Sequence, residues 1–243
     1  MNLHLTGNEA DIEDPDGQLL EAIISAQAAF IEESDLQKSF ARILEIILKI
    51  TGSEFGFIGE VFHDESGAPF LRTHSITDIS WDDESRRMYE ESVSRGLEFR
   101  NLNTLFGVTL PTCEPVISNN PADDSRIGGT PSGHPPMHSY LGMPIKHAGD
   151  MLGMVGIANR QHGYSEDVVE FVLPILNIAG SMASSQRLAR DSEALREELK
   201  SKNTLLEAVV NNIKDSLVIA DYAGNIRRVN RALETLLGFR ESE

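Results

Sequence analysis

The feature that most constrains this chain is a helical pattern that runs without a break from Ser165 to Asn212. At about 1.5 Å of rise per residue, one helix over this range is roughly 70 Å long, which is more than a single domain needs for its own packing. Ser165 suits the N-cap, and Glu166 and Asp167 fall in the first turn, where the helix dipole favours acidic side chains. We therefore expect the helix to begin inside one globular domain and to end where another begins.

The second half of this pattern predicts a coiled coil. Two heptad positions form the seam: Leu188, Leu195, Lys202 and Val209 on one, and Ser192, Leu199, Leu206 and Ile213 on the other. Two polar members make this seam weak. Between Asp191 and Lys202 the other faces are charged, so the helix needs a partner helix. A helix docked on its own domain is commoner in general, but here we favour a homodimer of parallel helices.

Composition limits the classes of function that remain. The chain has 243 residues, of which 40% are hydrophobic, so one or two domains with a substantial core are expected. Its formal charge of -17 argues against nucleic acid or an anionic membrane as a direct partner. The single cysteine, Cys113, excludes an intrachain disulfide framework and a cysteine-rich zinc site.

The N-terminus has no secretory signal pattern, because residues 1–16 carry five acidic side chains and no Lys or Arg. We expect this segment to be disordered. No stretch reaches 18 consecutive apolar residues, so we expect no membrane contact and a cytoplasmic location.

Periodicity predicts an α+β domain on an antiparallel sheet. Helices are expected over 19–31 and 36–50, the second with a capping box formed by Ser34 and Gln37 and a stop at Gly52. Strands are expected over 54–63, 70–79, 114–118, 137–146 and 151–158. We expect a short helix over 82–95, a helix with a loop over 97–111 and a proline-rich loop over 119–136.

Six motifs lie in order along the second half of this domain: Asn119-Asn-Pro121, Gly133-His-Pro-Pro136, Tyr140-Leu-Gly-Met-Pro-Ile145, Leu152-Gly-Met-Val-Gly156, Ala158-Asn-Arg160 and Gly163-Tyr164. On these motifs the region from Asp35 to Ser184 resembles the GAF family of small-molecule sensor domains. The resemblance implies a GAF-like antiparallel sheet flanked by helices, with a noncovalent ligand site over one face of the sheet.

The C-terminal region resembles the start of a PAS domain. The residues that carry this resemblance are Asp215-Ser-Leu-Val-Ile-Ala-Asp221, Gly224-Asn-Ile226, Val229-Asn230, Ala232 and Leu237-Gly-Phe239. They predict two short strands about a turn and then a helix that starts near Asn230. We interpret the chain as a fragment: a disordered segment over 1–16, a GAF domain over 17–184, a signalling helix over 185–212 and a truncated PAS start over 213–243.

The two resemblances imply a sensory fragment of a bacterial signal-transduction protein. Its output domain is expected to be a histidine kinase, with a diguanylate cyclase as the alternative, and neither lies in this sequence. We expect no catalysis in the fragment. The rival interpretation is a structural dimerisation module that binds no ligand.

Covalent and metal cofactors are not expected. Some GAF-like proteins reduce free methionine sulfoxide, but that chemistry needs several cysteines. Cys113 also lacks the adjacent histidine found where GAF domains bind a bilin. His134 and His138 have i, i+4 spacing, but the prolines between them prevent the helix that would align them, so neither haem nor a metal is expected. Asn159-Arg160 is only an approximate echo of the cyclic-nucleotide signature.

The ligand of the implied site is therefore an unidentified small molecule. Apolar walls with a few placed polar groups are typical of such sites. The candidate walls are Phe57, Trp81, Phe99, Leu105, Phe106 and Tyr140, and the candidate polar residues are Asn119, Asp124, Arg126 and His134. Arg126 is the residue whose planar fork suits an anionic ligand.

Overall fold

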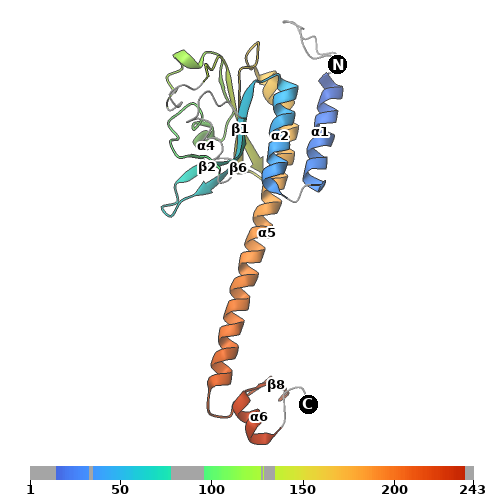
Figure 1. The fold of residues 1–243 in the computed structure, drawn as a ribbon, viewed down its shortest axis with the longest axis vertical. Coiled ribbons are helices and arrows are strands. Elements are labelled where there is room, and N and C mark those ends of the chain that lie inside the picture. The colour runs from blue at the N-terminus through green and yellow to red at the C-terminus, as the bar shows by residue number, and fades with distance from the viewer. Residues whose placement is uncertain (1–14, 33–34, 78–95, 127, 129–134, 239–243) are drawn as a thin grey trace. The chain divides into compact units, whose positions relative to one another are not determined.

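The computed structural model describes residues 15–32, 35–77, 96–126, 128 and 135–238. The chain divides into two compact units, the first ending at Gln186 and the second beginning at Arg187 (Figure 1). One helix, α5 (Glu166–Asn212), contributes residues to both units. The predicted continuous helix is therefore confirmed.

The first unit is built on a six-stranded antiparallel sheet with the strand order β3-β2-β1-β6-β5-β4. The strands are β1 (Phe55–His63), β2 (Pro69–Ile76), β3 (Glu98–Phe99), β4 (Val116–Ser118), β5 (Tyr140–His147) and β6 (Asp150–Ala158). A turn in which Ala148 and Gly149 have φ angles of 52° and 93° joins β5 to β6. Such left-handed angles at two central residues are typical of tight hairpins. This sheet confirms the predicted α+β class.

Helices α1 (Pro15–Glu32), α2 (Leu36–Thr51) and the first part of α5 cover one face of the sheet, which we call the helix face (Figure 1). Their apolar residues pack onto aliphatic residues of the central strands, among them Ile58, Ile145 and Val155. The core therefore lies between this helix layer and the sheet.

The ends of α2 show which local signals set its bounds. Asp35 is the N-cap, and its carboxylate accepts a hydrogen bond of 2.9 Å from the backbone N–H of Gln37. The predicted cap at Ser34 is therefore wrong, because the next residue has the extended backbone that a cap requires. The stop at Gly52 is confirmed, since Gly52 has a left-handed φ of 63°.

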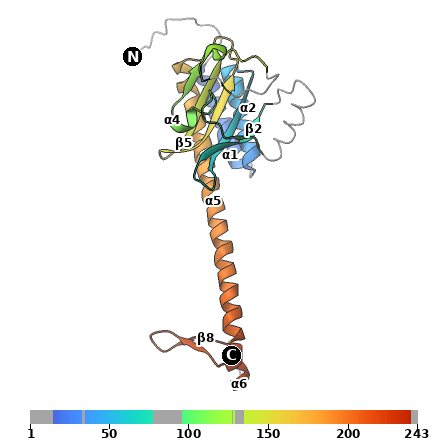
Figure 2. The same cartoon turned by 90° about the vertical axis from the view of Figure 1, so that its left-hand side faces the viewer.

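The opposite face of the sheet, which we call the α4 face, carries the short helix α4 (Thr109–Thr112) (Figure 2). A single 3-10 turn, η1 (Pro121–Asp123), follows β4. A second apolar cluster lies on this face and is rich in aromatic side chains. The segment predicted as helix plus loop over 97–111 holds α4, but it also holds β3, which pairs with Leu71 and Arg72 of β2. The helix predicted over 82–95 lies outside the described residues.

The first part of α5 is a core helix. Its buried residues include Val172, Ile175 and Ala179. By length and composition alone α5 could cross a membrane, because an 18-residue window reaches a mean hydropathy of 1.5. However, 44% of that window is buried inside the protein, as is usual for the core helix of a globular domain. Every residue from 188 to 209 is exposed.

The second unit ends in a small hairpin, β7 (Val218–Ala220) with β8 (Ile226–Val229), and the helix α6 (Arg231–Leu237). This order confirms the two strands and the helix predicted there. Asn230 is the N-cap of α6 and is fully buried. Its side chain also donates to the backbone oxygens of Ile213 and Asp215, so one residue holds the hairpin to the end of α5.

Candidate functional site

The α4 face has a gap in the middle of the sheet. Four residues lie directly opposite one another on neighbouring strands, in the order Phe57 of β1, Gly156 of β6, Gly142 of β5 and Val116 of β4. Directly paired residues point to the same face, so the two glycines leave room between Phe57 and Val116 for side chains from other positions.

Side chains from elsewhere reach into this gap. A Cβ atom at Gly142 would lie 2.7 Å from the Thr109 Oγ1 atom and 2.8 Å from the Tyr140 hydroxyl. A Cβ atom at Gly156 would lie 2.5 Å from the Phe57 ring and 3.0 Å from the Tyr140 hydroxyl. Real Cβ atoms do not approach this closely, so glycine is needed at both positions. The two hydroxyls therefore converge above the glycine pair.

These two hydroxyls have no hydrogen-bond partner among the described residues. Tyr140 is 1% exposed and Thr109 is fully buried, so water does not satisfy them from the surface. A buried polar group without a partner costs about 1–3 kcal/mol of stability. Burial also raises the pKa of Tyr140, so its hydroxyl stays protonated and can both donate and accept a hydrogen bond.

Aromatic rings form the walls around this point. The rings of Phe106 and Tyr140 meet edge to face with centroids 5.2 Å apart, and Phe57 lies 5.2 Å from Phe99 and 6.3 Å from Phe106. The structure thus brings together the predicted walls Phe57, Phe106 and Tyr140. Their role as ligand walls stays a prediction. Trp81 and His134 lie outside the described residues.

The side-chain amide of Asn119 forms hydrogen bonds with the backbone of Tyr164. Its Nδ2 donates to the backbone oxygen of Tyr164 at 2.9 Å, and its Oδ1 accepts from the backbone N–H of Tyr164 at 2.8 Å. Gly163 allows this approach, because a Cβ atom there would lie 2.5 Å from the Asn119 Oδ1 atom. Asn119 therefore ties the end of β4 to the segment that leads into α5.

Asp124 and Arg126 bind each other. The guanidinium donates through Nε at 2.8 Å and through Nη2 at 2.6 Å to the two oxygens of the carboxylate. These hydrogen bonds hold the pKa of Asp124 far below its ordinary value and raise that of Arg126. Asp124 thus occupies the fork that was predicted to bind an anionic ligand, so an anion would have to displace it.

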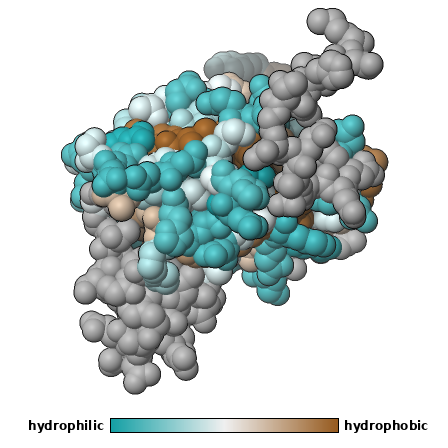
Figure 3. Space-filling view, turned by 90° about the horizontal axis from the view of Figure 1, so that it is seen from above, coloured by the Kyte–Doolittle hydropathy of each residue, from teal (hydrophilic) through white to brown (hydrophobic). Residues whose placement is uncertain are grey.

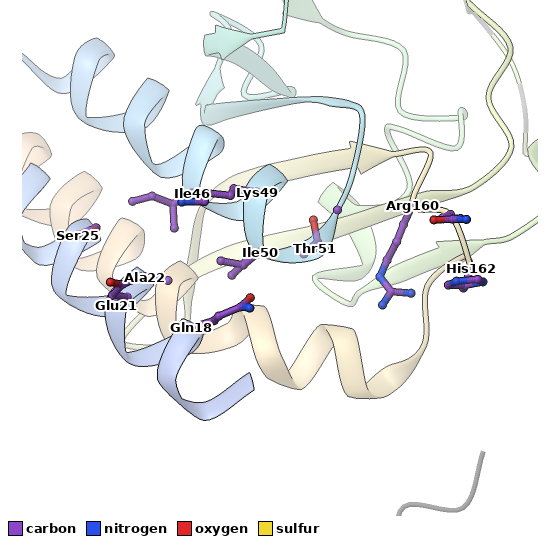
Figure 4. Close-up of a pocket in the computed structure, with 12 residues that line it drawn as sticks. Gln18, Glu21, Ala22, Ser25, Ile46, Lys49, Ile50, Thr51, Arg160 and His162 are labelled. Atoms are coloured by element: carbon purple, nitrogen blue, oxygen red, sulfur yellow. The ribbon is translucent and has the colours of Figure 1, made fainter. Parts of the chain in front are cut away.

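A hollow lies on the helix side of the sheet, where α1, α2 and the segment between β6 and α5 meet (Figure 4). Its volume is about 540 Å³, within the range of small-molecule sites. The residues that line it are Gln18, Glu21, Ala22, Ser25, Ile46, Lys49, Ile50, Thr51, Gly52, Arg160, Gln161 and His162. Figure 3 is seen from the end where α1 begins, and hydrophilic residues cover most of the described surface there.

Sequence patterns indicate neither Thr109 nor this hollow. Thr109 lies in a segment without period, so no pattern marks it. Glycines inside strands were a usable signal, because Gly142 and Gly156 indicate a close approach. No sequence signal joins Lys49 to Arg160. Among the described residues, no group of three or more His, Cys, Asp or Glu side chains is arranged to hold a metal ion.

Two models of known protein families match the chain. The family model described as GAF domain matches residues 33–182, and the one described as PAS domain matches residues 204–243. A search of curated proteins gave no match.

Solved structures give the same fold. The GAF domain of a phosphoenolpyruvate-protein phosphotransferase from Coxiella burnetii is 15% identical, with a TM-score of 0.58 over 75% of this chain and 99% of that one. Its counterpart from Acinetobacter is 14% identical, with a TM-score of 0.55 over 71% and 97%. The free methionine-R-sulfoxide reductase of Neisseria meningitidis is 11% identical, with a TM-score of 0.55 over 76% and 99%. At these identities the likeness to solved structures shows the fold alone. The match to the family model described as GAF domain covers more than half of the sequence. The chain therefore belongs to the GAF domain family.

Proposed function

We propose that this chain is the sensory part of a bacterial signal-transduction protein, and that its GAF unit binds a small molecule on the α4 face. The chain itself carries out no catalysis and works in the cytoplasm. The observation that carries the proposal is the pair of buried hydroxyls, of Thr109 and Tyr140, that converge without a partner above Gly142 and Gly156.

The chemistry of this site favours a ligand with an apolar body and one hydrogen-bonding group. Phe57, Phe106 and Tyr140 supply apolar ring surface on the α4 face. An oxygen or nitrogen atom placed between the hydroxyls would satisfy both and remove a cost of about 1–3 kcal/mol for each. Hydrogen bonds to these two hydroxyls would therefore add to the free energy of binding of such a ligand.

The signal passes along α5 in this proposal. Five of the six apolar members of the predicted seam are each at least 53% exposed: Leu188, Leu195, Leu199, Leu206 and Val209. A parallel second copy would cover them, and the weak seam would allow two packings of similar energy, between which the ligand selects. The PAS domain and an output domain, expected to be a histidine kinase, would receive the change.

A structural dimerisation module is the second candidate, and one observation favours it. Leu105, Tyr140 and Met154 on the α4 face are no more than 1% exposed, so side chains of the protein fill much of this region. If the region is a solid core, nothing binds and the two unpartnered hydroxyls are only a cost in stability.

A thermal-shift screen of the full chain distinguishes the two candidates. We expect one or more compounds among nucleotides, amino acids and aromatic acids to raise the melting temperature, because a ligand that binds only the folded state stabilises it. A screen in which none of these classes raises the melting temperature would favour the structural module.

A further inference from the structure

Helix α1 presents large apolar side chains to the solvent and small ones to the protein. It packs on α2 (Figure 1). Its most buried residues are small and no more than 4% exposed: Ala22, Ala26 and Ala29. On the outside, Leu20, Ile24 and Ile31 are 59%, 56% and 81% exposed. A helix on the surface of a globular domain ordinarily turns its large apolar residues inward. The reversed pattern indicates that another surface covers the outer side of α1.

The outer residues of α1 have the spacing of a coiled-coil seam. Leu20, Ile24, Gln27 and Ile31 follow one another at intervals of four, three and four residues, and all of them are exposed. In a heptad this spacing puts Leu20 and Gln27 at position d and the two isoleucines at position a. Ile at a with Leu at d favours a pair of parallel helices over larger bundles. We call these four residues the α1 stripe.

The α1 stripe is too small to hold a dimer by itself. A helix of 18 residues is about 27 Å long and about 10 Å wide, so one side of it offers on the order of 300 Å². A stable dimer buries about 800 Å² on each partner. The predicted seam of α5, from Leu188 to Val209, extends over about 33 Å of helix and calls for the same kind of partner, a parallel second copy. Together the two surfaces supply most of the area that a stable dimer needs.

We propose that the α1 stripe is an interface, and that its partner is α1 of a second, parallel copy of this chain. The proposal rests on the proposed function in one respect, the parallel orientation of the two copies. About a two-fold axis each residue of the stripe meets its own counterpart, so Leu20, Ile24 and Ile31 form apolar layers. Gln27 meets Gln27, and a polar layer of this kind fixes the register at a cost in stability.

The charges beside the stripe oppose this pairing and make it testable. Asp16 lies at position g and Glu21 at the following position e, and both are exposed. In a parallel pair, g of one helix faces e of the other. Asp16 of one copy therefore lies near Glu21 of the second copy, and their repulsion weakens the dimer. In an antiparallel pair these two residues would lie far apart.

Reversing one of these charges is expected to strengthen the dimer. Sedimentation velocity of the full chain over a range of concentrations measures the dissociation constant of the dimer. Glu21→Lys should tighten the dimer severalfold, because repulsion from Asp16 becomes attraction. Glu45→Lys is the matched control, since Glu45 is exposed on α2 and the variant makes the same change in net charge. Equal tightening by the two variants, or none in Glu21→Lys, would overturn the proposed pairing.

The apolar layers are tested by a loss of affinity. Ile24→Glu combined with Ile31→Glu should weaken the dimer about tenfold or more, because it places carboxylates opposite one another in the seam. Lys38→Glu, on the exposed side of α2, changes the net charge by the same amount and should weaken the dimer less than about twofold.

Two results would overturn the proposal: a wild-type chain that stays monomeric, or a double variant that dimerises as tightly as the wild type. If Leu195→Lys with Leu199→Lys abolishes the dimer while the double variant of α1 has no effect, the seam of α5 is the interface and the α1 stripe is not. None of these results bears on ligand binding at the α4 face, which the thermal-shift screen tests separately.

Discussion

The two faces of the GAF sheet are built in different ways. On the helix face the apolar side chains interlock with α1, α2 and α5, and buried hydroxyls such as those of Ser39 and Thr51 donate to backbone oxygens. On the α4 face two glycines carry no side chain, and the hydroxyls of Thr109 and Tyr140 that lie over them have no partner among the described residues. The two faces thus differ in how fully their buried polar groups are satisfied. In the function that we propose, the helix face holds the fold and the α4 face binds the ligand.

The largest effect is expected on the helix face. Ile145 is fully buried there, so Ile145→Ala should reduce the free energy of unfolding by about 2–5 kcal/mol through lost burial and a new cavity. Chemical denaturation monitored by circular dichroism measures this. A cost below about 1 kcal/mol would mean that this face is not the stabilising core.

Two tyrosine variants test whether a hydroxyl with a hydrogen-bond partner contributes more to stability than one without. The Tyr164 hydroxyl pairs with Ser53 at 2.7 Å, so Tyr164→Phe should cost about 1 kcal/mol of stability. Tyr140→Phe removes a hydroxyl that has no partner, and it should leave stability unchanged or raise it. Thermal unfolding of the two variants under one condition decides this, and a larger loss in Tyr140→Phe would show that its hydroxyl is already satisfied.

The pair formed by Asp124 and Arg126 should make a small, pH-dependent contribution. The pKa of Asp124 in the folded protein lies far below its ordinary value of 3.8, so the stabilisation is fully present above about pH 4 and is lost only as the pH falls through this lowered pKa. Because the Arg126 side chain is 39% exposed, solvent screening limits this to about 1 kcal/mol or less. Asp124→Asn should therefore be less stable than the wild type at pH 7 and at pH 4, and the difference should shrink only as the pH falls toward the lowered pKa. A difference that is already absent at pH 4 would show that Arg126 does not stabilise the ionised carboxylate.

The smallest effect on stability is expected where α5 leaves the helix face. Leu195 and Leu199 are 64% and 59% exposed, so replacing both with Lys should hardly change the unfolding of the GAF unit. If a second copy covers this seam, the same double variant should convert a dimer to a monomer in light scattering. A variant that stays dimeric would show that the interface lies elsewhere.

Sequence patterns were informative where one physical rule dominated. Alternation and turn residues predicted β1, β5 and β6, and helical period with an acidic first turn predicted α5. Sequence patterns failed where tertiary contacts determine whether an element forms. Strand β3 has only two residues and exists because β2 offers it a partner, so it has no period of its own.

The candidate site divides in the same way. Phe57, Phe106 and Tyr140 were predicted as walls and do lie together, because large apolar residues cluster wherever a face is covered. The roles of Asn119, Asp124 and Arg126 could not be predicted, since each depends on a partner that only the fold or a turn supplies: Tyr164 for Asn119, and Asp124 and Arg126 for each other. Lys49 and Arg160 are far apart in sequence, and only packing brings them to one hollow.

The most direct test of the central claim is the melting-temperature shift that a compound from the thermal-shift screen produces in three proteins: the wild type, Tyr140→Phe and Tyr164→Phe. We predict that the shift is lost in Tyr140→Phe, which removes one hydroxyl above the glycine pair, and is kept in Tyr164→Phe. A shift of equal size in Tyr140→Phe and in the wild type would contradict the claim that the α4 face binds the ligand through this hydroxyl.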